Sequence, residues 1–256
     1  MQYIKSDDRK EPNANQFEGR NAVLELLKSG RDIDKILVAK GNVEGTIKRI
    51  VGEASKKGIV IQEAARQKLD ELSQTKNHQG VIAFASAHDY STIEDILENA
   101  AVRGEEPFII VMDGITDPHN LGAVIRTAEC AGAHGIIIPK RRSVGLTAVV
   151  AKTSAGAVEY MPVAKVTNIS ATIDLLKSRG IWVAATDMKG ENYFKADLGG
   201  PIALVIGSEG DGVGRLVKEK CDFTVSIPMY GNITSLNASV AAGLIMYEVV
   251  RKRNFK

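Results

Sequence analysis

The sequence has only two cysteines, Cys130 and Cys221, and no long apolar run. Two cysteines cannot form a disulfide framework, and no Cys-x-x-Cys pair is present to hold a metal ion. No stretch approaches the ~20 apolar residues that a membrane-spanning helix needs. Residues 1–16 are polar and contain no apolar segment of the kind found in secretory signals. These absences indicate a cytosolic protein without a membrane segment.

Two common nucleotide-binding motifs are also missing. No Gly-x-Gly-x-x-Gly frame fits the glycine-rich stretch at residues 207–214, and neither Gly-Lys-Ser nor Gly-Lys-Thr follows it. The four histidines lack metal-ligand spacing and are expected on the surface or in loops: His78, His88, His119 and His134. We therefore expect neither a nicotinamide-dependent dehydrogenase nor a metal site.

Charge gives little direct information about partners. The 256 residues carry a net charge of +2, which is too small an excess to identify a nucleic-acid-binding protein. Local clusters at Lys140–Arg142 and Arg251–Arg253 suit phosphate contacts, and each suits an ordinary solvated surface equally well.

The first part of the chain alternates helix and strand patterns from Phe17 onward. Apolar positions three and four apart predict helices, and short apolar runs predict strands. The predicted helices are Asn21–Lys28, Val43–Lys57 and Ala64–Ser73, and the predicted strands are Lys35–Ala39, Ile59–Gln62 and Val81–Ala85. This alternation is typical of a small three-layer α/β domain, here over residues 17–90 after a flexible tail at residues 1–16.

A polar stretch at residues 104–107, Gly-Glu-Glu-Pro, marks the expected domain boundary. Residues 91–106 are expected to form a linker that holds one helix, with Ser91 and Glu94 as its capping box.

Residues 107–256 begin with a fully apolar strand, Phe108–Met112, which is typical of a buried parallel sheet. Further strands are predicted at Gly135–Ile138, Ile181–Ala185, Ala203–Ile206 and Phe223–Ile227. The predicted helices between them are Leu121–Ala131, Thr147–Ala155, Ile169–Ser178, Val213–Lys220 and Ser235–Lys252. Strands that alternate with helices predict a parallel sheet covered on both faces.

In open α/β sheets, ligands bind outside the carboxyl ends of the strands, so the residues after each strand are the most informative. Asn120 and Arg126 follow the first strand of the second domain. Asn120 fits an N-cap of the next helix. Arg126 lies in the small and apolar stretch GAVIRTAECAG, where a charge needs a carboxylate, a phosphate or a substrate as partner.

Two later stretches have the same position relative to their strands. The glycines of residues 207–214 let the backbone approach a ligand, and Glu209 among them fits either site chemistry or a helix-dipole role. Before the last helix, Ser235 and Asn237 fit helix caps. That helix is rich in small residues, which permit close approach of a neighbour.

Together and in this order, the three stretches resemble the signature motifs of the SpoU/TrmH RNA methyltransferases. The motifs are N-x-G-x-x-x-R, IGSEGxG and IPMxGxxxSLNxSVAAG, and the resemblance covers residues 107–250. Residues 17–86, with FEGRNAVLELL near their start and NHQGV near their end, resemble the family's small ribosomal-protein-like substrate-binding domain. This two-domain plan is most similar to the RlmB-type bacterial 23S ribosomal RNA guanosine-2′-O-methyltransferases.

The resemblance implies a SPOUT methyltransferase domain, an α/β fold with a parallel sheet and a trefoil knot, which uses S-adenosylmethionine and forms a homodimer through its last helix. It implies cofactor contacts from Thr186, Gly207, Ile227, Leu236 and Asn237. The catalytic residues that it implies are Asn120, Arg126, Glu209, Ser235 and Asn237. RNA contacts are expected from Arg20, Lys140, Arg141 and Arg142.

The implied reaction methylates a ribose 2′-hydroxyl, which must lose its proton as it attacks the methyl group. An arginine pKa above ~12 argues against Arg126 as a free base. We expect Arg126 to engage the substrate phosphate and polarise the hydroxyl, while Ser235 orients it from the same chain or from a partner subunit. Glu209, Asn120 and Asn237 are expected to hold the geometry.

The expected substrate is a guanosine of 23S ribosomal RNA, either as free RNA or in a ribosomal precursor. Two alternatives stay open: a transfer RNA 2′-O-methyltransferase, and a non-catalytic RNA-binding protein of ribosome assembly.

Overall fold

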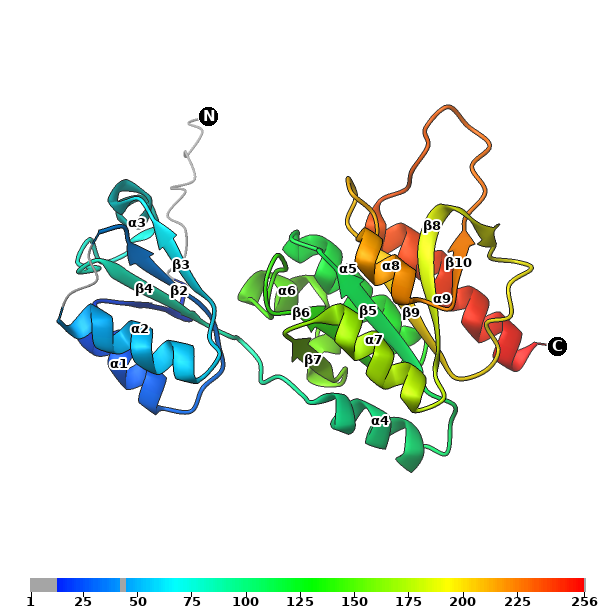
Figure 1. Cartoon of the computed structure of the whole chain (residues 1–256), viewed down its shortest axis with the longest axis horizontal. Helices are drawn as coiled ribbons and strands as arrows, with labels where there is room; N and C mark the ends of the chain where they lie inside the picture. Colours follow the sequence, from blue (N-terminus) through cyan, green and yellow to red (C-terminus); the bar gives the residue numbers. More distant parts are fainter. Residues whose placement is uncertain (1–12, 42–44, 256) are drawn as a thin grey trace, which may run out of the picture. The chain divides into compact units, whose positions relative to one another are not determined.

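The computed structural model describes residues 13–41 and 45–255, which form two compact units that divide between Ser86 and Ala87 (Figure 1). The expected boundary at residues 104–107 differs from this division, because helix α4 (Ile93–Val102) belongs to the second unit. Ile96 of α4 is buried in a core of that unit, against a glycine of its sheet. The expected tail at residues 1–16 lies mostly outside the described residues.

The N-terminal unit is a mixed four-stranded sheet with helices on both faces, which confirms the predicted three layers. Its elements are β1 (Gln16–Glu18), α1 (Arg20–Lys28), β2 (Ile33–Ala39), α2 (Thr46–Lys56), β3 (Ile61–Ala64), α3 (Arg66–Leu72) and β4 (Val81–Ala85). The strand order is β1-β4-β2-β3, and only β2 and β3 are parallel. Alternate residues of β2 face opposite cores: Ile36 and Val38 pack with α1 and α2, and Leu37 packs with Leu69 of α3.

The second unit is a six-stranded parallel sheet between two layers of helices, as the alternation predicted. After α4, its elements are β5 (Phe108–Asp113), α5 (Pro118–Cys130), β6 (Gly135–Pro139), α6 (Ala148–Thr153), a 3-10 helix (Ala157–Glu159), β7 (Val163–Val166), α7 (Ile169–Ser178), β8 (Trp182–Asn192), β9 (Ile202–Gly207), α8 (Arg215–Lys220), β10 (Phe223–Ser226) and α9 (Ala238–Asn254). The strand order is β10-β8-β9-β5-β6-β7.

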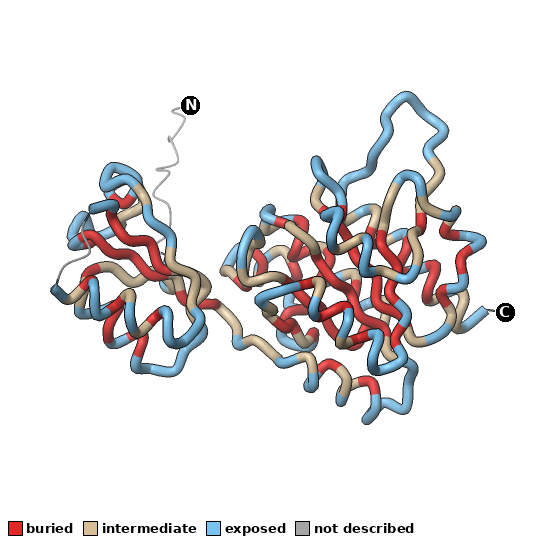
Figure 2. The backbone as a smooth tube through the Cα atoms, in the orientation of Figure 1, coloured by how far each residue is buried: buried red, intermediate tan, exposed pale blue. Residues whose placement is uncertain are grey.

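Each face of this sheet has its own hydrophobic core, and the strands between them are the most buried part of the unit (Figure 2). In β5, Phe108, Ile110 and Met112 pack in the core that contains residues of α5, α6 and α9. Ile109 and Val111 pack in the core that contains residues of α4 and α7. A strand buried on both faces explains why its sequence is continuously apolar.

The start of α4 differs from the expectation by one residue. Thr92 and Asp95, rather than Ser91 and Glu94, form the capping box. Ser91 instead forms a β-bridge with Ala164 of β7, so the helix begins only after this pairing.

Strands β1 and β7 were not predicted, and β8 is longer than predicted. Both missed strands are short and lie at sheet edges, where a strand lacks a long apolar run. Strand β8 pairs with β9 up to Ala185 and then pairs with β10 again at Glu191 and Asn192. Thr186 therefore lies where β8 separates from β9.

The strand order locates the crevice in which a ligand fits. Strands β6 and β7 follow β5 toward one edge of the sheet, whereas β8, β9 and β10 lie on the other side of β5. Such a reversal opens a crevice outside the carboxyl ends of the strands. Among the described helices, none combines the length and apolar character needed to cross a membrane.

Candidate active site and cofactor cavity

Three polar side chains from distant parts of the chain meet beside this crevice. Nδ2 of Asn120 donates to Oε1 of Glu209 at 3.0 Å. Nδ2 of Asn237 donates to Oδ1 of Asn120 at 2.8 Å and also donates to Oε1 of Glu209. The fold thus brings together one residue from each of the three sequence motifs.

Helix α9 fixes the direction of the Asn237 amide. Its Oδ1 accepts the backbone N–H groups of Ser239 at 3.0 Å and Val240 at 3.3 Å, and the Ser239 hydroxyl at 2.6 Å. Because the carbonyl oxygen accepts these donors, the amide nitrogen faces Asn120 and Glu209. One side chain therefore caps the helix, as the sequence predicted, and completes the polar network.

Asn120 does not cap α5, contrary to the expectation that it fits an N-cap. Oδ1 of Asp117 accepts the backbone N–H of His119 at 2.9 Å, and Pro118 occupies the first helical position, where its missing N–H has no effect on the helix. Asn120 lies one turn further and is only 6% exposed. A buried amide needs partners, which Asn237 and Glu209 supply.

Glu209 lies on a tight loop between β9 and α8. Ser208 and Gly212 exchange backbone hydrogen bonds of 3.2 and 3.0 Å across this loop. A Cβ at Gly207 would lie 2.0 Å from the carbonyl carbon of Gly212, so no side chain fits there. Helix α8 begins only at Arg215, so Glu209 neither caps it nor lies in its first turn.

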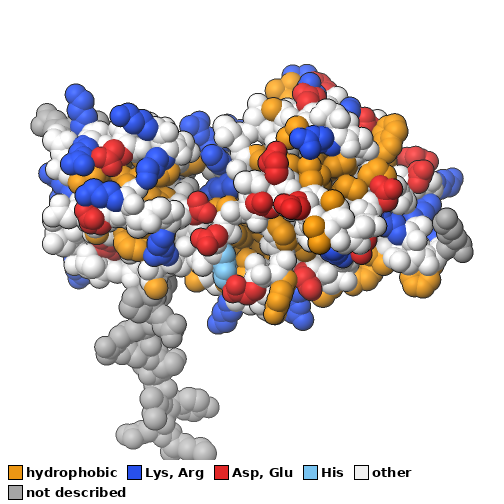
Figure 3. Space-filling view, turned by 90° about the horizontal axis from the view of Figure 1, so that it is seen from below, with side chains coloured by type: hydrophobic (Ala, Val, Ile, Leu, Met, Phe, Trp, Pro, Cys, Tyr) orange, Lys and Arg blue, Asp and Glu red, His pale blue; other side chains and the backbone are white. Residues whose placement is uncertain are grey.

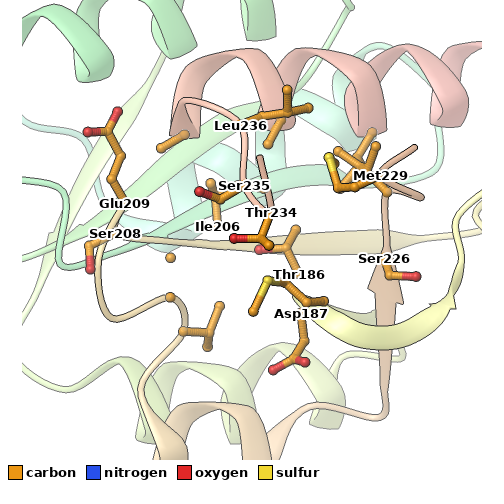
Figure 4. A pocket seen from close by; sticks show the side chains of 18 of the residues that line it. Thr186, Asp187, Ile206, Ser208, Glu209, Ser226, Met229, Thr234, Ser235 and Leu236 are labelled. Carbon is orange, nitrogen blue, oxygen red and sulfur yellow. The ribbon is translucent and has the colours of Figure 1, made fainter. Parts of the chain in front are cut away.

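A cavity of about 660 Å³ adjoins this network, between the ends of β8, β9 and β10 and the start of α9 (Figure 4). Four residues expected to contact a cofactor line it, together with Glu209 and Ser235: Thr186, Gly207, Ile227 and Leu236. Glu209 lies at one end of the cavity and Met229 at the other (Figure 4). The volume falls within the ~300–1,000 Å³ typical of small-molecule sites.

An ion pair that the sequence did not reveal lies in the wall of this cavity. Nζ of Lys218 lies 2.6 Å from Oδ2 of Asp187, and both residues line the cavity. The hydrogen bond from Lys218, aided by the backbone N–H of Lys189, lowers the pKa of Asp187. Asp187 directly follows Thr186, so its place after a strand was an available signal. No pattern in the sequence pointed to Lys218 on α8.

Arg126 and Ser235 do not join the network. Both are exposed, and neither forms a hydrogen bond or ion pair within the part of the chain that the structure describes. The Arg126 guanidinium therefore has no carboxylate partner among residues 13–41 and 45–255, which leaves it open to a phosphate or another substrate group.

The four expected RNA contacts lie in different units. Lys140, Arg141 and Arg142 occupy the loop after β6, at the same sheet edge as the cavity, and Arg141 and Arg142 are exposed. Arg20 begins α1 in the N-terminal unit.

Two of the four histidines are buried, contrary to expectation: His78 is 2% exposed and His134 is 0% exposed. Nδ1 of His134 accepts the backbone N–H of Phe108 at 2.9 Å, and Nε2 contacts Glu105 at 3.0 Å. Burial lowers the pKa of His134. Cys130 is exposed. Among the described residues, no group of His, Cys, Asp and Glu side chains has the arrangement of a metal site.

Comparison with known families gives one match in each part of the chain. Residues 107–247 match the SpoU rRNA Methylase family, and residues 17–91 match the RNA 2'-O ribose methyltransferase substrate binding family. The chain is 53% identical over 237 residues to YacO of Bacillus subtilis (strain 168), a protein of the TrmH family of tRNA/rRNA methyltransferases. The match covers 92% of this chain and 95% of that protein.

Two solved structures share the fold, with about a quarter of the aligned residues identical. AviRb, a SpoU methyltransferase from Streptomyces viridochromogenes in complex with AdoMet, is 26% identical with a TM-score of 0.58, over 93% of this chain and 89% of that chain. An RNA 2′-O ribose methyltransferase is 27% identical with a TM-score of 0.53, over 93% of this chain and 88% of that chain.

Proposed function

The chain belongs to the SpoU rRNA methylase family, and from this premise we propose that it methylates a ribose 2′-hydroxyl of RNA with S-adenosylmethionine as methyl donor. One observation carries the proposal above all others. Asn120, Glu209 and Asn237, each from a different sequence motif, form a single hydrogen-bonded network beside a cavity of about 660 Å³.

The residues around the cavity fit a cofactor of this kind. Gly207 and the glycine-rich loop expose backbone to the cavity, and Ile227 and Leu236 provide apolar walls. The hydroxyl of Thr186 donates to the Val205 carbonyl at 3.1 Å, which fixes the hydroxyl and leaves its oxygen able to accept from a ligand. When bound, S-adenosylmethionine supplies a methyl group already activated by its sulfonium charge.

The chain's own residues must position the ribose and help its hydroxyl lose a proton. Oε1 of Glu209 accepts both asparagine amides, and this keeps the carboxylate in place at the end of the cavity. We assign Arg126 to the substrate phosphate next to the reacting ribose, where its charge polarises the hydroxyl. Its exposure and lack of a carboxylate partner among the described residues support this role.

We propose that two copies of the chain form the active unit. Val240, Leu244 and Tyr247 follow one another along α9 at helical spacing and are 52%, 41% and 50% exposed. An apolar stripe of this kind on a helix indicates a partner surface. The small residues Ala238 and Ala242 are buried within the chain itself, so they do not carry this argument.

The proposed dimer face lies beside Arg126. Helices α5 and α9 pack closely, since a Cβ at Gly243 would lie 3.6 Å from Thr127, the next residue after Arg126. A second copy on the α9 stripe would therefore approach Arg126, and its Ser235 is the residue that we assign to orient that guanidinium.

Among RNA substrates, we propose a guanosine of 23S ribosomal RNA, in free RNA or in a ribosomal precursor. The N-terminal substrate-binding unit supports an extended RNA target. Transfer RNA is the second candidate, because the name of the Bacillus subtilis relative gives both tRNA and rRNA. A trefoil knot in the second unit and a cytoplasmic location stay predictions.

The test is methyl transfer from radiolabelled S-adenosylmethionine to unmodified 23S RNA, with transfer RNA in parallel, followed by alkaline cleavage. A methylated 2′-hydroxyl cannot attack the neighbouring phosphate, so the modified linkage survives alkali. One protected guanosine in 23S RNA is the expected result. Bound cofactor without transfer to any RNA or precursor particle would favour a non-catalytic RNA-binding protein instead.

A further inference from the structure

Two segments that are far apart in the sequence lie side by side in the N-terminal unit: residues 18–21 and the loop at residues 73–80. The backbone N–H of Arg20 donates to Oε1 of Gln79 at 3.1 Å, and Nε of Arg20 donates to the Gln79 carbonyl at 3.3 Å. These are the FEGRNAV and NHQG segments, and neither is among the residues that line the cavity of the second unit.

The Glu18 carboxylate holds the first half of this loop. It accepts the Ser73 hydroxyl at 2.6 Å, the Gln74 backbone N–H at 2.6 Å and both the backbone N–H and the hydroxyl of Thr75. Oε1 also accepts Nε2 of Gln16 at 2.7 Å. These donors outweigh partial burial and lower the pKa of Glu18 to about 2, so the carboxylate stays ionised at neutral pH.

His78 holds the second half of the loop. It is 2% exposed, its Nε2 lies 2.8 Å from Oδ1 of Asp70, and its Nδ1 accepts the backbone N–H of Gly80 at 3.0 Å. Lys76 and Gln79, on either side of this anchor, have φ angles of 56° and 51°. Left-handed backbone is unfavourable for residues with side chains, and it persists where the surroundings impose it and a site uses it.

The anchored loop presents side chains that the fold does not use. Lys76 and Asn77 are exposed, and their side chains form no hydrogen bond or ion pair with the described residues. The terminal nitrogens of Arg20 likewise form no hydrogen bond with the described residues, and Gly19 beside it packs against the loop, since a Cβ there would lie 3.5 Å from the Asn77 carbonyl oxygen. Residues 13–86 contain twelve Lys and Arg against nine Asp and Glu, and blue side chains are frequent on this unit in Figure 3. Its excess of positive charge suits a polyanion.

We propose that Arg20, Lys76 and Asn77 form an RNA-contact surface that Glu18 holds in its binding shape before RNA arrives. The two cations contact phosphates, and the Asn77 amide pairs with the edge of an unstacked base, which makes a looped or single-stranded segment the fitting partner. This inference rests on the proposed function and places RNA contacts in the N-terminal unit, whereas the methyl-transfer network belongs to the second unit.

The first test measures binding of the full chain to unmodified 23S RNA transcript, with a matched charge-reversal control. Lys76→Glu and Arg20→Glu should each weaken binding by roughly tenfold. Each should also reduce the slope of log Kd against log salt concentration by about one, which corresponds to one lost phosphate contact. Lys48→Glu makes the same charge change at an exposed position of α2 outside the surface and should have under ~3-fold effect. Equal effects of Lys76→Glu and Lys48→Glu would overturn the assignment.

The second test addresses the role of Glu18 as a positioning residue. Glu18→Gln keeps the size of the side chain but replaces one of the two accepting carboxylate oxygens by an amide nitrogen, which cannot accept the loop's hydrogen bonds. Amide hydrogen exchange at Gln74 and Thr75 should accelerate, and RNA affinity should fall although Arg20, Lys76 and Asn77 are intact. Faster exchange with unchanged affinity would overturn the claim that the loop must be held in shape.

The outcomes separate this inference from the proposed activity. Binding that depends on Lys76, in a protein that transfers no methyl group, supports the surface and overturns the activity. Methyl transfer to 23S RNA with the same Kd in Lys76→Glu, Arg20→Glu and wild type supports the activity and overturns the surface. The variants should bind S-adenosylmethionine as wild type does, since none of them alters the cavity.

Discussion

Asn237→Asp separates two tasks that one side chain performs. Its oxygen caps α9 through the Ser239 and Val240 N–H groups, and its nitrogen donates to Asn120 and Glu209. Aspartate keeps an accepting oxygen for the cap but has no N–H to donate. It also places a carboxylate beside that of Glu209, so the network should open while the helix stays capped.

The expected magnitudes follow from these contacts. Asn and Asp cap helices about equally well, so Asn237→Asp should change stability by under ~1 kcal/mol, or a few degrees in Tm. Asn237→Ala loses the cap and should cost about 1 kcal/mol. Displacement of a positioned catalytic group by about 1 Å can reduce rates ~100-fold, which corresponds to about 2.7 kcal/mol in the activation free energy. We expect a loss of this order in kcat/KM for both variants.

The assay combines thermal unfolding with methyl transfer to unmodified 23S RNA. Asn168→Asp is the matched control, because Asn168 caps α7 through the Ala171 N–H and lies outside the network. It should retain both stability and activity. Near-normal turnover by Asn237→Asp would refute the catalytic role of the amide nitrogen, and a Tm as low as that of Asn237→Ala would refute the retained cap.

Three further predictions test other parts of the site and core. Arg126→Lys should lower kcat/KM by ~100-fold at unchanged Tm, because Arg126 is exposed and lysine lacks the planar fork that pairs with phosphate; near-normal turnover would remove Arg126 from the mechanism. Gly207→Ala should abolish calorimetric binding of S-adenosylmethionine because its Cβ would meet the Gly212 backbone, whereas Gly210→Ala meets open space and should bind normally. Burial lowers the pKa of His134 in the folded state. Between this pKa and the unfolded-state value of ~6.5, the unfolded chain binds more protons than the folded chain. The free energy of unfolding is therefore higher above pH ~6.5 and decreases as the pH falls below it. Urea unfolding one unit above and below that pH should show a smaller difference for His134→Gln than for wild type, and an equal difference would refute this account.

Several features of the site were readable from the sequence because they depend on local chemistry. The three motifs lie after strands, and the carboxyl ends of parallel strands share one edge of a sheet, so their convergence there was predictable. The capping role of Asn237 was also predictable, since a cap needs only a short polar side chain and the next two N–H groups.

Other features depend on which distant residues become neighbours in the folded chain, and local sequence patterns do not give this. Asn120 fits a cap as well as Asp117 does, and Pro118 together with the distant Glu209 decides between them. Ser91 precedes a helix pattern, yet its pairing with Ala164 removes it from the helix. The Lys218–Asp187 ion pair joins two elements whose contact exists only in the folded unit.

The sequence by itself determined most of the order of helices and strands, the parallel sheet of the second unit and the three motifs that meet beside the cavity, because periodicity and strand exits are local properties. Only the tertiary structure decided which side chains bond to one another. It joined Asn120, Glu209 and Asn237 into one network and left Arg126 exposed. It also showed that Glu18 holds a loop more than fifty residues away. Such contacts depend on chain segments that meet only after folding, and on burial that selects which polar groups must find partners.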